Sequence, residues 1–320
     1  MRVGLLGLGR IGAFHAATLA AHPLVDELVV ADPVRTSPYG RPGDPFESDA
    51  VVIATPTGTH AELIIRACES GIPVFCEKPV AGTVAETVKV LEASAGNRVR
   101  IGFQRRFDPG YVAAARAVRD GELGELHRVH LVTADPAPPP AEYIATSGGI
   151  FRDCHIHDFD ILRWVTGREV TSVHAAGANR GAAFFAAAGD VDTSAALLTL
   201  DDGTLATLQG SRYNGGGYDV RMELAGTRRT QAVGLGPRAP LHTTEGPPSR
   251  ERPWPDFVTR FETAYRDEID GFLRSCAVAG ETSGDGLCSI EEALEALYVA
   301  EAADLSLSER RTVEVAEVRR

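Results

Sequence analysis

The chain has 320 residues, 44% of them hydrophobic, and a formal net charge of −12 at pH 7. This length is enough for about two domains, and the apolar content is ordinary for a protein with a full core. The negative charge argues against nucleic-acid binding, which requires a basic surface, and no apolar run reaches the length of a membrane span.

Cysteine usage and the N-terminus bear on the cellular compartment. The five cysteines are scattered and form no CxxC pair, which is typical of reduced thiols rather than of a disulfide framework. The chain enters an apolar strand at once and has no small-residue cleavage site of a signal peptide. These features predict a cytoplasmic protein.

The glycine motif GLGRIG, Gly7 to Gly12, follows the first predicted strand. The apolar run Val3 to Leu6 predicts a buried parallel strand, and a helical pattern begins after the motif. Glycines in this position allow a tight turn and a close approach of backbone N–H groups to a pyrophosphate, and the helix N-terminus favours the negative charge. The residues expected to contact a dinucleotide are Gly7, Gly9, Arg10, Ile11 and Gly12.

An acidic residue follows at the spacing that a dinucleotide-binding unit requires. Asp32 ends the next predicted strand, Leu28 to Ala31, and lies 20 residues past Gly12, where a ribose-binding carboxylate is expected. A carboxylate accepts hydrogen bonds from both ribose hydroxyls but repels a 2′-phosphate, which favours NAD over NADP. Arg35, three residues further on, could moderate this preference.

The segment from Arg35 to Asp49 is rich in Pro, Gly and Ser and shows neither helical nor strand periodicity. Parallel strands need a crossover of a dozen or more residues, usually with a helix, and Val51 to Ala54 is clearly the next strand. We therefore expect a crossover with little or no regular helix, which leaves the adenosine side of the site open.

Two further strand ends carry polar residues. Thr55 and Pro56 follow the strand that ends at Ala54, and Glu77-Lys78-Pro79 follows the apolar strand from Gly71 to Cys76. The carboxyl ends of parallel strands face the ligand crevice in such a sheet. The candidates for cofactor contact are therefore Thr55, Pro56, Glu77 and Lys78. His60, at the start of the next predicted helix, fits a structural role without a ligand.

A polar segment in the middle of the chain runs from Gly148 to Asp160. Asp153 and His157 are four residues apart, and on a helix such residues lie on one face. A carboxylate there can fix the tautomer of an imidazole, which can take a proton near neutral pH. The same residues also fit a helix start with capping acids and a core histidine, and the segment alone does not decide between the two.

The second half of the chain predicts a different architecture. Strand-like content occurs at Leu126–Thr133, Val170–Ala175, Thr193–Leu200, Thr204–Ser211 and Val220–Leu224. Adjacent strands without intervening helices indicate an antiparallel sheet. Helical patterns occur at Tyr111–Arg119, Phe257–Cys276 and Ile290–Ala303, and the stretch from Gln231 to Trp254 is loop-like.

Five motifs occur in order along the chain: GLGRIG, ATPTGTH, EKPV, GFQRRFD and GGIFRDCHIHDFD. As a set they resemble the Gfo/Idh/MocA oxidoreductase family, and three further stretches, Asp135–Tyr143, Gly217–Asp219 and Arg260–Tyr265, resemble its bacterial myo-inositol 2-dehydrogenases. The resemblance implies an α/β fold. Its parts are an N-terminal Rossmann domain for NAD, residues 1–107, and a C-terminal α+β domain, residues 108–320. In this family the second domain has an open, mostly antiparallel sheet that mediates oligomerisation, commonly to a tetramer.

The resemblance also implies catalytic roles. Lys78 matches the catalytic lysine of the EKP motif, and Asp153 and His157 match the acid and the histidine of the DxxxH motif. We expect His157 to take the hydroxyl proton, Asp153 to orient His157, and Lys78 to stabilise alkoxide charge or share the proton transfer. Only a neutral imidazole accepts a proton, so oxidation should rise with pH through one ionisation.

Substrate contacts are implied in the same way. Arg105 and Asp160 stand where the family contacts polyol hydroxyls, and Tyr218 and Tyr265 are weaker candidates for that role. The family needs no metal, and the cluster of Cys154 with its neighbouring histidines has no spaced partner pair elsewhere that would complete a metal site.

The chain departs from the family pattern at three places. One is the segment from Arg35 to Asp49; the others are Ala134 and Gly216, which stand where the family's inositol dehydrogenases usually have an Arg or His and a Tyr, respectively. The expected reaction is oxidation of a secondary alcohol of a cyclic polyol to a ketone, with myo-inositol as the first candidate. Another sugar, an aminocyclitol or a modified polyol stays open as the substrate, as does a non-catalytic NAD-binding regulator.

Overall fold

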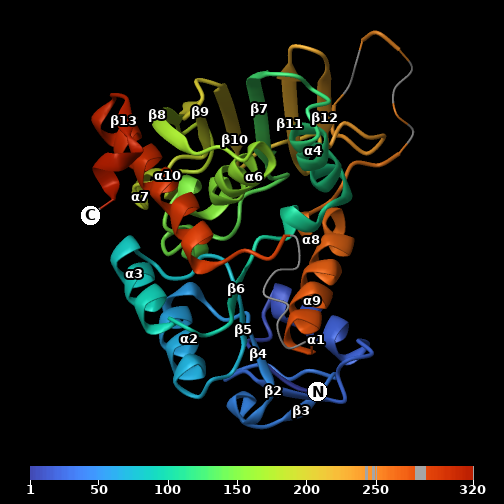
Figure 1. Ribbon diagram of the computed structural model, residues 1–320. Coiled ribbons are helices and arrows are strands. Elements are labelled where there is room, and N and C mark those ends of the chain that lie inside the picture. Colours follow the sequence, from blue (N-terminus) through green and yellow to red (C-terminus); the bar gives the residue numbers. More distant parts are fainter. Residues whose placement is uncertain (242–243, 247–248, 250, 278–285, 320) are drawn as a thin grey trace. The chain divides into compact units, whose positions relative to one another are not determined.

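The computed structural model describes residues 1–241, 244–246, 249, 251–277 and 286–319. Its contacts divide the chain into two compact units, Met1–Phe107 with Thr263–Glu295, and Asp108–Glu262 with Ala296–Arg320. Each unit is built around one sheet (Figure 1). The sequence predicts a second domain over residues 108–320, whereas these contacts join Thr263–Glu295 to the first unit.

The first unit contains a six-stranded sheet in the order β3-β2-β1-β4-β5-β6, in which all neighbours are parallel. Its strands are β1 (Arg2–Leu6), β2 (Glu27–Ala31), β3 (Arg41–Pro42), β4 (Ala50–Ile53), β5 (Val74–Glu77) and β6 (Val99–Gly102). Its helices include α1 (Arg10–Ala20), α2 (His60–Glu69), α3 (Val84–Ala93) and α9 (Glu262–Ala277). The central strand β4 is buried along its whole length, as expected for a parallel strand covered on both faces. The predicted Rossmann arrangement is confirmed.

The link between β2 and β4 contains no α-helix. It forms only the two-residue strand β3 and a 3-10 turn, Pro45–Glu47. The turn is capped by Asp44, whose carboxylate accepts a hydrogen bond from the N–H of Phe46 at 3.0 Å. The reduced crossover predicted for the segment from Arg35 to Asp49 is therefore confirmed.

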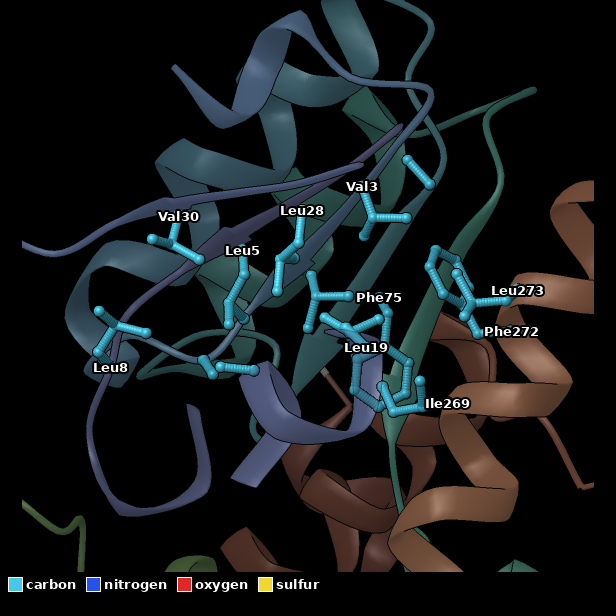
Figure 2. Close-up of a cluster of buried hydrophobic side chains, with 14 residues drawn as sticks. Val3, Leu5, Leu8, Leu19, Leu28, Val30, Phe75, Ile269, Phe272 and Leu273 are labelled. Atoms are coloured by element: carbon cyan, nitrogen blue, oxygen red, sulfur yellow. The ribbon is translucent and has the colours of Figure 1, made fainter. Parts of the chain in front are cut away.

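Helix α9 completes the core of the first unit, although it comes late in the chain. Its residues Ile269, Phe272 and Leu273 pack in one cluster with apolar side chains of β1, β2 and β5 (Figure 2). The rings of Phe75 and Phe272 lie 5.7 Å apart between centroids. All three α9 side chains are fully buried, so removal of this helix would expose the apolar interior of the unit.

The second unit contains a seven-stranded sheet in the order β12-β11-β7-β10-β9-β8-β13. Among its described strands, β7 and β10 pair in parallel and the other neighbours are antiparallel. The strands are β7 (Leu126–Ala134), β8 (Val170–Ala178), β9 (Thr193–Leu200), β10 (Leu205–Ser211), β11 (Asp219–Gly226), β12 (Thr230–Val233) and β13 (Val313–Glu314). The predicted mostly antiparallel sheet is confirmed, and the two short edge strands are additions to it.

The remaining helices are α4 (Pro109–Arg119), α5 (Ala141–Ile144), α6 (Ile156–Thr166), α7 (Phe184–Ala187), α8 (Phe257–Arg260) and α10 (Ile290–Glu309). The single helix predicted over Phe257–Cys276 is broken at Phe261 into α8 and α9. Part of the loop predicted from Gln231 to Trp254 lies outside the described residues. None of the helices in the described parts combines the length and apolar character that crossing a membrane demands.

One face of the second sheet is covered, and the other is open. Helices α4 and α6 lie along the covered face (Figure 1). Buried and exposed residues alternate along β9 and β10, the pattern of a sheet with one face on the core. On the open face Leu197 is 45% and Leu205 is 47% exposed.

Candidate active site

The glycine turn after β1 depends on two close backbone approaches. Gly7 has a φ of +91°, and a Cβ there would lie 2.5 Å from the carbonyl oxygen of Ala54. A Cβ on Gly12 would lie 2.1 Å from the carbonyl oxygen of Gly7. Only glycine fits both positions. The turn leads directly into α1, whose first residues include the predicted contacts Arg10 and Ile11 and whose N-terminus can hold a phosphate.

Asp32, which follows β2, faces this turn. Its Oδ2 accepts a hydrogen bond from the N–H of Leu8 at 2.7 Å. Its Oδ1 accepts from the N–H groups of Val34 at 2.8 Å and Arg35 at 2.7 Å. These backbone donors, led by Leu8, hold the pKa of the Asp32 carboxyl below its ordinary value. The carboxylate is therefore ionised at neutral pH.

A cavity of about 510 Å³ opens beside the turn. Its lining includes Gly7 and Leu8 from the turn, Asp32 and Arg35 from the end of β2, and Thr55 from the end of β4. The structure thus brings together three of the predicted cofactor contacts, while Pro56 follows Thr55 as an exposed residue. An ionised carboxylate beside a glycine turn fits the ribose and pyrophosphate of a dinucleotide.

The EKP segment begins on the last residue of β5. The carboxylate Oε1 of Glu77 lies 2.6 Å from Nε2 of His15, a completely buried residue of α1. Lys78 follows as a half-buried residue, and its peptide bond to Pro79 is cis. Glu77, predicted as a cofactor contact, is therefore also bound to the helix that starts at the glycine turn.

The segment predicted to carry the acid and the histidine forms a π-helical turn, Phe151–His155, which continues into α6. Gly148 and Gly149 precede it with positive φ angles. π-Helical turns occur frequently at functional sites. Asp153 lies in the π turn and His157 in the first turn of α6, so their side chains do not follow the regular α-helical spacing that the sequence suggests.

Two residues that the sequence analysis did not single out hold Asp153. Its Oδ2 accepts a hydrogen bond from Nη2 of Arg212 at 2.8 Å, and its Oδ1 accepts from the hydroxyl of Tyr143 at 2.7 Å. The Tyr143 side chain is 47% exposed, but desolvation of its hydroxyl group, followed by the Asp153 carboxylate, raises its pKa, which keeps this hydroxyl protonated as a donor. Arg212 is buried, and its Nη1 lies 3.4 Å from Oδ2 of Asp135. Asp153 is thus fixed as an oriented carboxylate.

A second buried network anchors the π turn to the sheet. Nδ1 of His155 lies 2.7 Å from Oδ2 of Asp158, and its Nε2 lies 2.8 Å from Oγ of Ser194 on β9. Oδ1 of Asp158 accepts a hydrogen bond from Oγ1 of Thr133 on β7 at 2.8 Å. All four side chains are buried. A buried network with these bonds fixes local geometry, so His155 is a structural histidine of this segment.

The four candidates for substrate contact are distributed over both units. Arg105 lies in the 3-10 turn Gln104–Phe107 after β6, and Tyr265 lies on α9, where its ring centroid is 6.1 Å from that of His15. Asp160 lies on α6, and Tyr218 directly precedes β11. All four side chains are buried. Among the described residues, no group of three or more His, Cys, Asp or Glu side chains is arranged to hold a metal ion.

An acidic residue beside the π turn predicts a dependence of stability on pH. Arg152 pairs with Glu301 at 2.6 Å, and its Nη1 lies 3.3 Å from Oδ2 of Asp304. Burial raises the pKa of Asp304 to about 7; Arg152 opposes this rise, and Glu301 and Asp190 add to it. In the unfolded chain the carboxyl titrates near ~4. The folded state therefore binds more protons between about pH 4 and 7, and the free energy of unfolding should fall as pH rises through this range.

Asp304→Asn should flatten this fall, because an amide has no proton to release. Urea unfolding at about pH 5 and about pH 8 measures the slope. Glu309→Gln, at the exposed end of the same helix, is the control and should keep the slope of the unmodified chain. An unchanged slope in Asp304→Asn would contradict the assignment of this titration to Asp304.

Two protein families match this chain, one in each predicted domain. Residues 40–104 match the family described as "Oxidoreductase family, NAD-binding Rossmann fold", and residues 111–231 match the "GFO/IDH/MocA C-terminal domain". An inositol 2-dehydrogenase of Rhizobium meliloti (strain 1021) is 36% identical over 333 aligned positions, which cover 99% of both chains. A scyllo-inositol 2-dehydrogenase (NAD(+)) of Bacillus subtilis (strain 168) is 37% identical over 88% of this chain and 87% of that protein.

A solved structure extends the similarity to three dimensions. It is that of scyllo-inositol dehydrogenase from Lactobacillus casei with bound cofactor NAD(H) and scyllo-inositol. It has a TM-score of 0.85 and 30% sequence identity, with 99% of each chain covered. Because both domains and nearly the full length are shared with such relatives, the chain belongs to the Gfo/Idh/MocA family of oxidoreductases.

Proposed function

We propose that this protein is an NAD-dependent dehydrogenase that oxidises a secondary alcohol of a cyclic polyol to a ketone, with myo-inositol as the first candidate substrate. The main support is the full-length similarity to a protein named inositol 2-dehydrogenase. The chain also retains Lys78, Asp153 and His157, the acid–base set of the family motifs. A regulator that only senses NAD would not need this set.

The first unit is suited to hold the dinucleotide. The glycine turn offers backbone N–H groups and a helix N-terminus to the pyrophosphate, and Asp32 offers an ionised carboxylate to the ribose hydroxyls. Arg10, Ile11, Thr55, Pro56 and Glu77 are further proposed contacts. Bound NAD supplies the hydride acceptor, and the protein supplies orientation and proton transfer.

We assign the proton transfer to His157. Its neutral imidazole accepts the proton of the reacting hydroxyl, and Lys78 stabilises the developing alkoxide or shares the transfer. Asp153 orients His157 and stabilises its charged form. The bonds from Arg212 and Tyr143 support this role of Asp153, because they fix the direction in which its carboxylate points. Arg105, Asp160, Tyr218 and Tyr265 are the proposed contacts to the polyol hydroxyls.

The substrate can be tested with a panel of polyols. Myo-inositol, scyllo-inositol, an aminocyclitol and glucose are each supplied with NAD, and the absorbance of reduced cofactor is followed. We expect the highest kcat/KM with a cyclic polyol. Ala134, which stands where the related dehydrogenases usually have an Arg or His, keeps aminocyclitols and modified polyols in the panel. Tight NAD binding without turnover of any polyol would contradict the proposal and support a regulator.

Cofactor choice depends on Asp32. The wild-type protein should have a higher kcat/KM with NAD than with NADP, because the carboxylate repels a 2′-phosphate. Asp32→Ala should narrow the gap by about tenfold, which corresponds to ~1.4 kcal/mol. Asp26→Ala removes an exposed carboxylate from the same unit and should leave the ratio unchanged. If the wild-type protein prefers NADP, the argument from Asp32 is wrong.

We infer that the protein is a homo-oligomer, most simply a tetramer, assembled through the open face of the second sheet. Leu197 and Leu205 are nearly half exposed there, and exposed apolar sheet faces favour association. Leu197→Arg should lower the mass found by light scattering at micromolar concentration. Leu235→Arg, which alters an equally exposed leucine outside the sheet, should not. A monomeric wild-type mass would contradict the inference.

The five cysteines, none in a disulfide, support a cytoplasmic location.

A further inference from the structure

A completely buried histidine holds the residue on the N-terminal side of Lys78. His15 of α1 lies with Nε2 at 2.6 Å from the carboxylate of Glu77, the residue that β5 contributes directly before the lysine. The ring of His15 is packed among aromatic rings, with its centroid 5.9 Å from that of Phe75. The Glu77 carboxylate lies over Gly102 of β6, where a Cβ would be only 3.1 Å from its Oε2. The carboxylate therefore has little freedom to move.

A second buried histidine holds the residue on the C-terminal side of Lys78. His60, the first residue of α2, is 1% exposed. Its Nδ1 lies 2.7 Å from the carbonyl oxygen of Pro79, and its Nε2 lies 2.9 Å from the carbonyl oxygen of Thr55. The ring thus joins the chain directly after the lysine to the end of β4, where a predicted cofactor contact lies.

The two acceptors of His60 define its chemistry. A carbonyl oxygen can only accept a hydrogen bond, and each imidazole nitrogen donates only when it carries a proton. A neutral ring can satisfy one of the two carbonyls, and an imidazolium ring satisfies both. Either form binds the two strand ends more firmly than an apolar side chain of the same size, because buried carbonyl groups require a donor.

We propose that His15 and His60 are positioning residues for Lys78: His15 fixes the lysine through the side chain of Glu77, and His60 fixes it through the carbonyl group of Pro79. The inference rests on the proposed function, in which Lys78 meets the reacting hydroxyl. The hydrogen bonds of His15 and His60 connect the EKP segment to α1 and to the end of β4. Both of these carry proposed cofactor contacts, so the lysine is placed relative to the dinucleotide. Misplacement of a catalytic group by about 1 Å can cost on the order of 100-fold in rate.

Paired substitutions distinguish positioning from bulk stability. The amide nitrogen of asparagine lies near the position of histidine Nδ1, and that of glutamine near Nε2. At residue 60, asparagine keeps the bond to Pro79, whereas glutamine keeps the bond to Thr55. At residue 15, glutamine keeps the bond to Glu77, whereas asparagine loses it. We therefore expect a crossed pattern, in which His60→Asn and His15→Gln retain most of kcat, and His60→Gln and His15→Asn lose about 10–100-fold.

The KM for NAD should change less than kcat in all four variants. If the substitutions acted only by lowering stability, the kcat values of the asparagine and glutamine variants would not depend on which hydrogen bond each variant retains. His22 is the matched control, since its Nε2 lies 3.0 Å from Asp270 in the same unit, away from the EKP segment. His22→Asn and His22→Gln should both keep the kcat of the wild-type protein.

A readout that does not need turnover completes the test. Each variant is treated with an amine-reactive N-hydroxysuccinimide ester, and acylation of Lys78 is followed by peptide mass spectrometry. Lys78 should be acylated faster in His60→Gln and His15→Asn, which lose the hydrogen bond, than in His60→Asn and His15→Gln, which keep it. Acylation of Lys89 is the internal reference. If acylation shows the crossed pattern but the protein oxidises no polyol, the positioning of Lys78 by the two histidines is supported and the proposed function is contradicted. Equal kcat losses and equal acylation in all four variants would overturn the positioning itself.

Discussion

Replacing His157 with alanine should lower kcat for polyol oxidation by roughly 10²–10⁴-fold, the contribution of a general base. The KM for NAD should change little, because the proposed cofactor contacts lie in the other unit of the chain. In the wild-type protein the rate should rise with pH through one ionisation, since only the neutral imidazole accepts a proton. In His157→Ala that step should disappear.

The control for this substitution is His127→Ala, which removes an exposed histidine from β7 in the same unit. It should keep both the wild-type kcat and the wild-type pH profile. If His157→Ala retains near wild-type turnover on the best polyol, His157 is not the base. Lys78 then becomes the candidate, and Lys78→Met should abolish the pH-dependent step instead.

Arg212→Met should be the most destabilising of the substitutions considered in the second unit. The guanidinium is 3% exposed and lies 2.8 Å from Asp153 and 3.4 Å from Asp135. Its removal takes a cation away from a largely buried carboxylate, and breaking such a pair costs about 3–5 kcal/mol of the free energy of unfolding. The kcat should fall as well, because Asp153 loses the donor that orients it. Arg212→Lys retains the charge and should recover part of the stability.

Chemical denaturation at neutral and acidic pH tests this expectation. The deficit of Arg212→Met should shrink in acid, where protonation of the carboxylates removes the uncompensated charge. The comparison is Arg128→Met, which breaks the exposed pair of Arg128 with Glu223 at 2.7 Å and should cost about 0–1 kcal/mol. A deficit in Arg212→Met no larger than that of the exposed pair would show that Asp153 does not depend on Arg212.

The first unit could be predicted well from the sequence because its signals are local. Buried parallel strands appear as continuous apolar runs, and the glycine motif with Asp32 has a fixed spacing. The missing crossover helix was equally visible, because a Pro- and Gly-rich segment cannot support helical periodicity. In contrast, the apolar pattern of α9 predicts a helix but not its partner, so the packing of Phe272 against Phe75 required the structure.

The candidate site was predicted only in part, for the same reason. The motifs place Lys78, Asp153 and His157 in the sequence, but Tyr143 and Arg212, which donate hydrogen bonds to Asp153, lie 10 and 59 residues away from it. No periodicity encodes such a pairing. The usable signal for Arg212 is its place directly after a strand and before a glycine-rich loop. The π turn was also invisible, because its residues fit a regular helix start equally well.

Transfer of the reacting hydrogen tests the central claim most directly. Myo-inositol deuterated at the carbon that bears the 2-hydroxyl is incubated with the protein and NAD, and the reduced cofactor is examined by mass spectrometry. The account predicts reduced NAD that carries one deuterium, formed together with an equal amount of the ketone. In His157→Ala it predicts that almost no deuterated cofactor forms within the same reaction time. Failure of the wild-type protein to transfer deuterium from this or any other cyclic polyol to NAD would contradict it.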